Sequence, residues 1–318
     1  MQHFQASHTT NDLGNQLDRV IEQAGTLILG KTTQIRLSLS CLLANGHLLI
    51  EDLPGLGKTT LAHVLAHLLG LEFQRIQFTS DMLPGDILGV SIYDQNRANF
   101  TFHPGPIFTQ LLLADEVNRA TPKAQSALLE AMEERQVTVE GETRPLPEPF
   151  FVIATQNPQY QIGTFPLPES QLDRFLMAIT MGYPDRQAER SLLQQTAEPR
   201  HRLHELDGCL QPMQLLELQK LVPAIHAAEP LLDYVQAILH YSRESGRYHQ
   251  GLSPRAGIAL LRSAQAWALL AHRNHVLPED IQAVLPAVCN HRLHRVAQHD
   301  DPAQTDAATD LLRHVVIP

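Results

Sequence analysis

The sequence predicts an α/β protein in which a parallel β-sheet flanked by helices is followed by a smaller all-α domain. Between residues 47 and 182, short apolar runs alternate with segments of helical spacing, which is typical of strands joined by helical crossovers. After Gly182-Tyr183-Pro184, apolar residues recur only at helical spacing. We therefore expect two domains, residues 1–182 and residues 183–318.

Five apolar runs are the expected strands of the sheet, at residues 47–52, 72–78, 108–115, 150–155 and 175–181. Residues 12–46 precede the first strand and are expected to form a helical lead-in. Helices of the second domain should be separated by breaks near Pro199, Gly208, Pro230, residues 246–251 and Pro278.

Two hairpins are expected to interrupt the alternation of strands and helices. Residues 91–93 and 99–102 flank a polar segment at 94–98, within an insertion that spans about residues 87–103. Residues 136–139 and 143–146 alternate polar and apolar side chains around Glu140-Gly141-Glu142. Both insertions are unusual for a simple kinase-like phosphate-binding enzyme.

A phosphate-binding loop follows the first expected strand, in the segment HLLIEDLPGLGKT at residues 47–59. Glycines let the backbone N–H groups surround phosphates, Lys58 reaches the β- and γ-phosphates, and the Thr59 hydroxyl is an Mg²⁺ ligand. One position departs from the general pattern, because Asp52 stands where glycine is usual. The residues expected to hold ATP are Pro54, Gly55, Leu56, Gly57, Lys58, Thr59 and Thr60. Residues 28–30 should reach the same pocket.

A pair of acids completes the expected site at the end of the third strand, Asp115-Glu116. An acid at a strand's carboxyl end can hold Mg²⁺ opposite Thr59, and its neighbour can polarise the water that attacks the γ-phosphate. Such a pair alone would more simply cap the next helix. Together with Lys58 and Thr59, it predicts hydrolysis of a nucleoside triphosphate.

The composition argues against several other classes of protein. With 24 basic and 34 acidic residues the net charge is −10, so nucleic acid is a poor default partner. The three cysteines are far apart and match no metal or disulfide spacing. We find no signal peptide and no apolar run long enough to span a membrane, and therefore expect a cytoplasmic protein without membrane insertion.

Two histidine pairs, His201/His204 and His291/His294, have helical spacing. Neither pair has a convincing third ligand, and arginines surround both. We interpret them as solvated helix faces rather than as metal sites.

Beyond these inferences, the chain resembles the MoxR family of AAA+ ATPases over about residues 15–295. The stretches that carry the resemblance are EDLPGLGKTTLA (51–62), RIQFTSDMLPGDILG (75–89), FTFHPGPIF (100–108), LLADEVNRATPKAQSALLEAMEERQVTVEG (112–141), PFFVIATQNP (149–158), LPESQLDRF (167–175) and LSPRAGIALL (252–261). The family also tolerates the Asp52 departure. The resemblance implies a P-loop AAA+ core with a helical lid, a helix-2 insertion (about 87–103) and a presensor hairpin (about 136–146).

The resemblance also implies catalytic roles for three more residues besides Glu116. Asn157 matches the polar sensor that helps to orient the attacking water. Arg174 matches the arginine finger that acts on a neighbouring subunit, and Arg255 matches the second sensor, which touches the nucleotide of its own subunit. The resemblance further implies a homo-oligomeric ring, usually a hexamer. It also implies a client protein with a von Willebrand factor A domain, which the ATPase helps to assemble or to take up a metal or cofactor.

Two other functions stay open at this point. Helicases of the MCM type share both insertions, but a DNA motor would carry basic hairpin tips, whereas these read Asp94-Gln95-Asn96-Arg97 and Glu140-Gly141-Glu142. A slow nucleotide-dependent binding switch, which acts through its ordered state rather than through work, is the other alternative.

Overall fold

A five-stranded parallel sheet forms the centre of the computed structural model, which describes residues 2–95, 98–157, 164–194, 199–296 and 306–317. The strand order is β2 (Phe73–Gln77), β5 (Leu111–Asp115), β8 (Phe151–Gln156), β1 (Leu48–Glu51) and β9 (Met177–Ile179). Each strand lies within or beside one of the five apolar runs of the sequence. The predicted parallel sheet is therefore confirmed.

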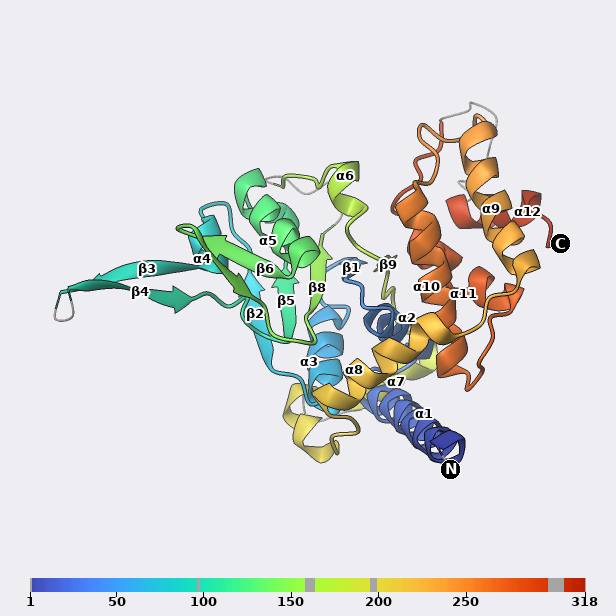
Figure 1. Ribbon diagram of the computed structural model, residues 1–318, viewed down its shortest axis with the longest axis horizontal. Coiled ribbons are helices and arrows are strands. Elements are labelled where there is room, and N and C mark those ends of the chain that lie inside the picture. The colour runs from blue at the N-terminus through green and yellow to red at the C-terminus, as the bar shows by residue number, and fades with distance from the viewer. Residues whose placement is uncertain (1, 96–97, 158–163, 195–198, 297–305, 318) are drawn as a thin grey trace.

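Helices cover both faces of this sheet (Figure 1). Leu48 and Ile50 of β1 join one hydrophobic cluster, while Leu49 between them joins the other, as expected from the two-residue period of a strand. Within residues 1–182, the helices that contribute to the first cluster are α1 (Gln2–Leu27), α2 (Thr32–Leu43) and α3 (Lys58–Leu68). The second cluster contains α4 (Pro84–Leu88), α5 (Pro122–Glu134) and α6 (Glu169–Leu172). The lead-in was predicted correctly as helical.

Both predicted hairpins are present. The first pairs β3 (Gly89–Asp94) with β4 (Asn99–Pro104) and extends away from the sheet as a long arm (Figure 1). Two residues of its expected tip, Asn96 and Arg97, lie outside the described residues. The second pairs β6 (Gln136–Val139) with β7 (Glu142–Pro145). Its turn residues Glu140 and Gly141 have φ of 54° and 82°, as a tight two-residue hairpin turn requires.

The second part of the chain is helical, as predicted. Its α-helices are α7 (Arg186–Gln194), α8 (Pro212–Leu221), α9 (Glu229–Glu244), α10 (Pro254–Leu270), α11 (Pro278–Cys289) and α12 (Ala307–His314), and its 3₁₀ helices are η2 (Pro199–Glu205) and η3 (Val222–Ala224). Pro230 lies inside the first turn of α9 rather than between helices, because proline is tolerated there. Helix α10 packs against α2, and buried residues from both sides of residue 182 belong to one hydrophobic cluster. The boundary at 182 stays a prediction.

The interpretation of His291 as part of a solvated face is wrong. The end of α11 packs against the segment before β9, so His291 is buried, and its Nε2 lies 3.3 Å from the carbonyl oxygen of Phe175. Burial, and next the charge of Arg292, lower the pKa of His291 well below its ordinary value. His294 is exposed. Among the described residues, no three His, Cys, Asp or Glu side chains are grouped so that they could hold a metal ion.

Across the same part of the chain, none of the helices is long and apolar enough to cross a membrane.

Candidate functional site

The predicted phosphate-binding loop connects β1 to α3. Gly55 and Gly57 have φ of 86° and 85°, a left-handed conformation that L-residues with a Cβ rarely adopt. Lys58 is the first residue of α3, and its Nζ donates a hydrogen bond of 2.6 Å to the carbonyl oxygen of Asp52. Burial lowers the pKa of Lys58, and the nearby Asp52, Asp115 and Glu116 oppose that shift. The loop thus holds the Lys58 ammonium group against its own backbone, near three carboxylates.

Asp52, the departure from the usual loop pattern, has a structural role of its own. One carboxylate oxygen accepts from the N–H of Leu53 at 2.8 Å, and the other accepts from the N–H of Gly182 at 2.6 Å. Glycine could make neither contact. Asp52 therefore connects the start of the loop to the turn that follows β9.

A cavity of about 490 Å³ lies over the loop. It is lined by all the loop residues expected to bind nucleotide, Pro54, Gly55, Leu56, Gly57, Lys58, Thr59 and Thr60, and by Asp115, Glu116 and Asn157. Apolar residues also line it, namely Leu27, Ile28, Leu29, Met181, Pro184 and Leu192. The placement of residues 28–30 at this pocket is thus confirmed for Ile28 and Leu29. A cavity lined both by apolar residues and by a phosphate-binding loop suits a nucleotide.

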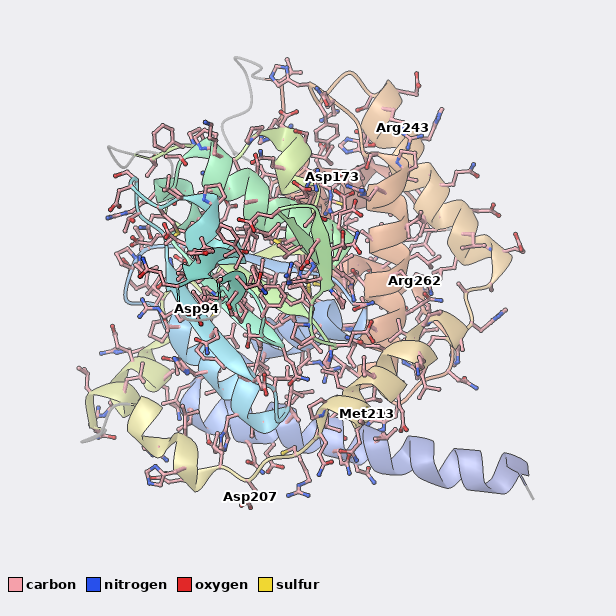
Figure 2. All side chains as sticks on the ribbon, turned by 60° about the vertical axis from the view of Figure 1, so that its left-hand side comes forward. Asp94, Asp173, Asp207, Met213, Arg243 and Arg262 are labelled. Carbon is pink, nitrogen blue, oxygen red and sulfur yellow. The ribbon has the colours of Figure 1, made fainter. Side chains whose placement is uncertain are left out.

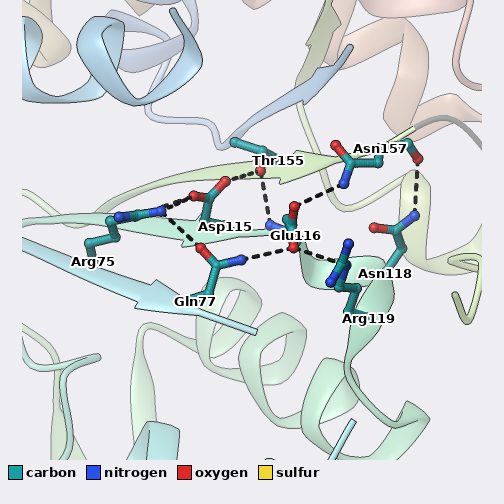
Figure 3. Close-up of polar contacts among 8 residues, drawn as sticks. All are labelled: Arg75, Gln77, Asp115, Glu116, Asn118, Arg119, Thr155 and Asn157. Carbon is teal, nitrogen blue, oxygen red and sulfur yellow. Dashed lines mark hydrogen bonds and ion pairs between the residues drawn. The ribbon is translucent and has the colours of Figure 1, made fainter. Parts of the chain in front are cut away.

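Asp115 lies at the carboxyl end of β5 and is shared by two donors (Figure 3). Arg75 of β2 donates from Nε at 3.2 Å and from Nη2 at 2.6 Å, and the hydroxyl of Thr155 donates at 2.5 Å. Asp115 is therefore a charged, well-oriented carboxylate. Together with the Thr59 hydroxyl, it provides the hard oxygen ligands that Mg²⁺ prefers, so the residues present fit a magnesium nucleotide.

Glu116, next to Asp115, is fixed at both carboxylate oxygens (Figure 3). Asn157 donates to one oxygen at 3.0 Å, while Gln77 and Arg119 each donate to the other at 2.9 Å. Its backbone has φ of 59°, in the left-handed region that non-glycine residues seldom occupy. The structure thus brings Glu116 and the expected sensor Asn157 into direct contact, inside the cavity.

Sequence reasoning missed Arg75, Gln77, Arg119 and Thr155. A signal for one of them was available, because the carboxyl ends of parallel strands meet at the same edge of a sheet. Gln77 ends β2 and pairs with Asp115 in the register between β2 and β5. The order of strands, which sets this pairing, was not predicted from the sequence.

Arg174 and Arg255 lie elsewhere. Neither of these described residues lines the cavity. Arg174 forms an ion pair with Glu133 and donates to the carbonyl oxygen of Leu129 at 3.2 Å. Arg255, at the start of α10, donates to the other oxygen of Glu133 at 2.5 Å. In this structure Arg255 therefore lies beside Arg174 and not at the cavity of its own subunit.

The chain is similar to known proteins over most of its length. The family model "ATPase family associated with various cellular activities (AAA)" matches residues 47–177, and the model "AAA lid domain" matches residues 240–311. The protein YeaC of Bacillus subtilis is 43% identical over 309 residues, which cover 96% of each chain. Chaperone MoxR1 of Mycobacterium tuberculosis is 39% identical over 286 residues, 87% of this chain and 75% of the relative.

A crystal structure of an ATPase candidate from Cytophaga hutchinsonii superposes with a TM-score of 0.90 and 36% sequence identity. The match covers 100% of this chain and 99% of that one. The similarity therefore extends over the sheet, both hairpins and the helical region.

Proposed function

Because the chain belongs to the MoxR family of AAA+ ATPases, we propose that its ATP hydrolysis drives the remodelling or maturation of a protein client, including the insertion of a metal or cofactor. The observation that supports this proposal best is that the expected catalytic residues lie in two separate places. One cavity holds the phosphate loop, Glu116 and Asn157, while two arginines suited to the same reaction lie outside it. A complete site then needs a second subunit.

Within one subunit, the residues of the cavity have distinct tasks. The loop N–H groups and Lys58 would bind the phosphates, and Thr59 and Asp115 would hold Mg²⁺, which would neutralise phosphate charge. Glu116 accepts a proton from the attacking water. Asn157 holds the Glu116 carboxylate at 3.0 Å, so the base and the water-orienting amide move as one group.

Between subunits, Arg174 and Arg255 would provide positive charge to the γ-phosphate of the neighbour. Their side chains are 31% and 53% exposed, so both guanidinium groups are accessible to a partner surface. An arginine supplied in trans contributes ~10³–10⁵ in rate in related phosphoryl transfers. This arrangement supports a homo-oligomeric ring, and we propose a hexamer.

The client would contact the hairpins. Val90, Ile92, Tyr93 and Phe100 on the β3–β4 arm are large apolar residues that are 46–63% exposed, a surface suited to a protein partner. Arg144 of the second hairpin lies over the ring of Phe102 at 4.0 Å, so the two hairpins contact each other. We propose a von Willebrand factor A-domain protein as the client. The acidic Glu140 and Glu142 at the turn of the second hairpin do not favour DNA.

The test combines mixed rings with client stimulation. Lys58→Ala should abolish ATP binding, and Arg174→Ala should bind ATP but lose turnover. Mixing the two should restore part of the activity, because the Lys58→Ala subunit donates its intact arginines to a competent neighbour. No recovery in intact mixed rings would contradict action in trans. If DNA raises turnover and a purified von Willebrand factor A-domain protein does not, the client proposal is wrong and the protein is a DNA motor.

A further inference from the structure

Glu133, at the carboxyl end of α5, joins the two arginines of the proposed trans site. Its two carboxylate oxygens bind different partners, one Arg174 and the other Arg255. The hydrogen bond from Arg255 is the main cause that holds the pKa of Glu133 below its ordinary value; burial opposes this shift, and the charges of Arg174 and Arg255 add to it. Glu133 is thus a charged bridge between two guanidinium groups from separate parts of the chain.

The elements that meet at Glu133 are held by further contacts. Asp173, beside Arg174, lies where the sheet domain meets the helical region (Figure 2). It accepts from Arg292 at 2.7 Å and from Ser253 at 3.4 Å, and Ser253 also caps α10. The backbone segments that carry Arg174 and Arg255 are therefore held next to each other. What Glu133 adds is the orientation of the two side chains.

The position of Arg255 is unfavourable without an anion. It lies in the first turn of α10, where the helix dipole is positive and a cation is destabilising. Glu133 compensates both this dipole and the like charge of Arg174. Each guanidinium has five N–H donors in a planar fork, so binding one carboxylate oxygen leaves donors for a phosphate.

We propose that Glu133 is a positioning residue that holds Arg174 and Arg255 as a preorganised pair for the nucleotide of the neighbouring subunit. This inference rests on the proposed function in trans. Without Glu133, the two long side chains separate by charge repulsion and lose their common orientation, so the rate of hydrolysis falls while ATP binding in the cavity is unchanged. A misplacement of about 1 Å costs up to ~10²-fold in rate.

The experiment compares Glu133→Gln with Glu134→Gln, a matched control at an exposed neighbouring position on the same helix end. Glu133→Gln has one acceptor oxygen in place of two and no charge, so it cannot bind the two arginines at separate oxygens or compensate their charge. We expect kcat to fall at least about tenfold with KM for ATP and ring assembly unchanged. Glu134→Gln should behave as the unmodified protein. Glu133→Asp, which keeps the charge, should recover part of the rate.

A double-variant cycle separates positioning from a general structural role. In an Arg174→Ala, Arg255→Ala background, Glu133→Gln should have no further effect on kcat. An additional loss there, or an unchanged or increased kcat for Glu133→Gln alone, would overturn the inference. Failure of the proposed function looks different, because Arg174→Ala itself would then retain full turnover.

Discussion

The carboxylate of Asp52 accepts a hydrogen bond of 2.6 Å from the backbone N–H of Gly182, which joins the phosphate loop to the turn after the last strand of the sheet. Gly182 has φ of 63°, so the turn itself needs glycine. Since the helical region begins just beyond this turn, the loop that binds phosphate and the start of that region are connected by one side chain.

Asp52→Ala should weaken ATP binding several-fold, because both N–H groups lose their acceptor and the loop becomes less ordered before the nucleotide binds. Titration with a fluorescent ATP analogue measures this change. Asp52→Asn, which keeps one acceptor oxygen, should have an intermediate affinity. Equal affinities for all three proteins would show that the contact does not order the loop.

Glu116→Gln should bind ATP with near-normal affinity and hydrolyse it ~10²–10⁴-fold more slowly, because the amide keeps the shape of the side chain but cannot accept a proton from water. Single-turnover hydrolysis and ATP binding, measured on the same preparation, separate the two effects. Turnover at the unmodified rate would show that Glu116 is not the base.

Gln77→Leu should raise the basal rate of hydrolysis. Gln77 donates to one oxygen of Glu116 at 2.9 Å and thereby competes with water for that oxygen. Losing one hydrogen bond to a charged group corresponds to roughly 1.5 kcal/mol, or about tenfold at most in rate. Steady-state assays without client measure the change. A decreased rate, with ATP affinity unchanged, would instead make Gln77 part of the catalytic arrangement.

Replacing Glu140 and Glu142 with Lys should weaken client-stimulated turnover while leaving basal hydrolysis unchanged, since neither residue lines the described cavity. Glu142 also forms an ion pair with Arg144, so Glu140→Lys alone is the control that keeps this pair. The measurement is the ratio of turnover with and without the von Willebrand factor A-domain protein. Unchanged stimulation in both variants would show that the turn of the second hairpin does not contact the client.

The protein should lose stability in acid partly through His47. Its Nε2 donates to the carbonyl oxygen of Met132 at 3.1 Å, and its Nδ1 accepts from the N–H of Val152 at 3.0 Å, which requires the neutral ring. Burial, and next the charge of Arg135, lower its pKa to about 3.

Between about pH 6.5 and pH 3 the unfolded chain therefore binds a proton at His47 that the folded protein does not, and stability falls as the pH is lowered. In this range, His47 changes the free energy of unfolding by roughly 1.4 kcal/mol per pH unit. Denaturant titrations at pH 7 and pH 5 give the free energy of unfolding at each pH. The difference between the two values should be smaller for His47→Gln than for the unmodified protein. An equal difference would assign the acid sensitivity to other groups.

Local patterns were enough to predict the strands, both hairpins and the loop residues, because each depends on neighbours in sequence. Contacts across strands were not predictable in the same way. The pairing of Arg75 with Asp115 depends on β2 lying next to β5, and the bridge at Glu133 depends on α10 meeting the end of α5. Similarly, His291 was misinterpreted because its burial comes from the segment before β9, more than a hundred residues away.

Helix α5 has a consequence for how subunits in a ring would communicate. It begins shortly after Glu116 and ends one residue beyond Glu133, and a helix of 13 residues is about 20 Å long. The helix thus connects the region of Glu116, the base that activates the attacking water, to the Glu133 bridge between the two arginines proposed to act on the next nucleotide. A displacement of this helix after hydrolysis would therefore shift the two arginines that the same subunit offers to its neighbour.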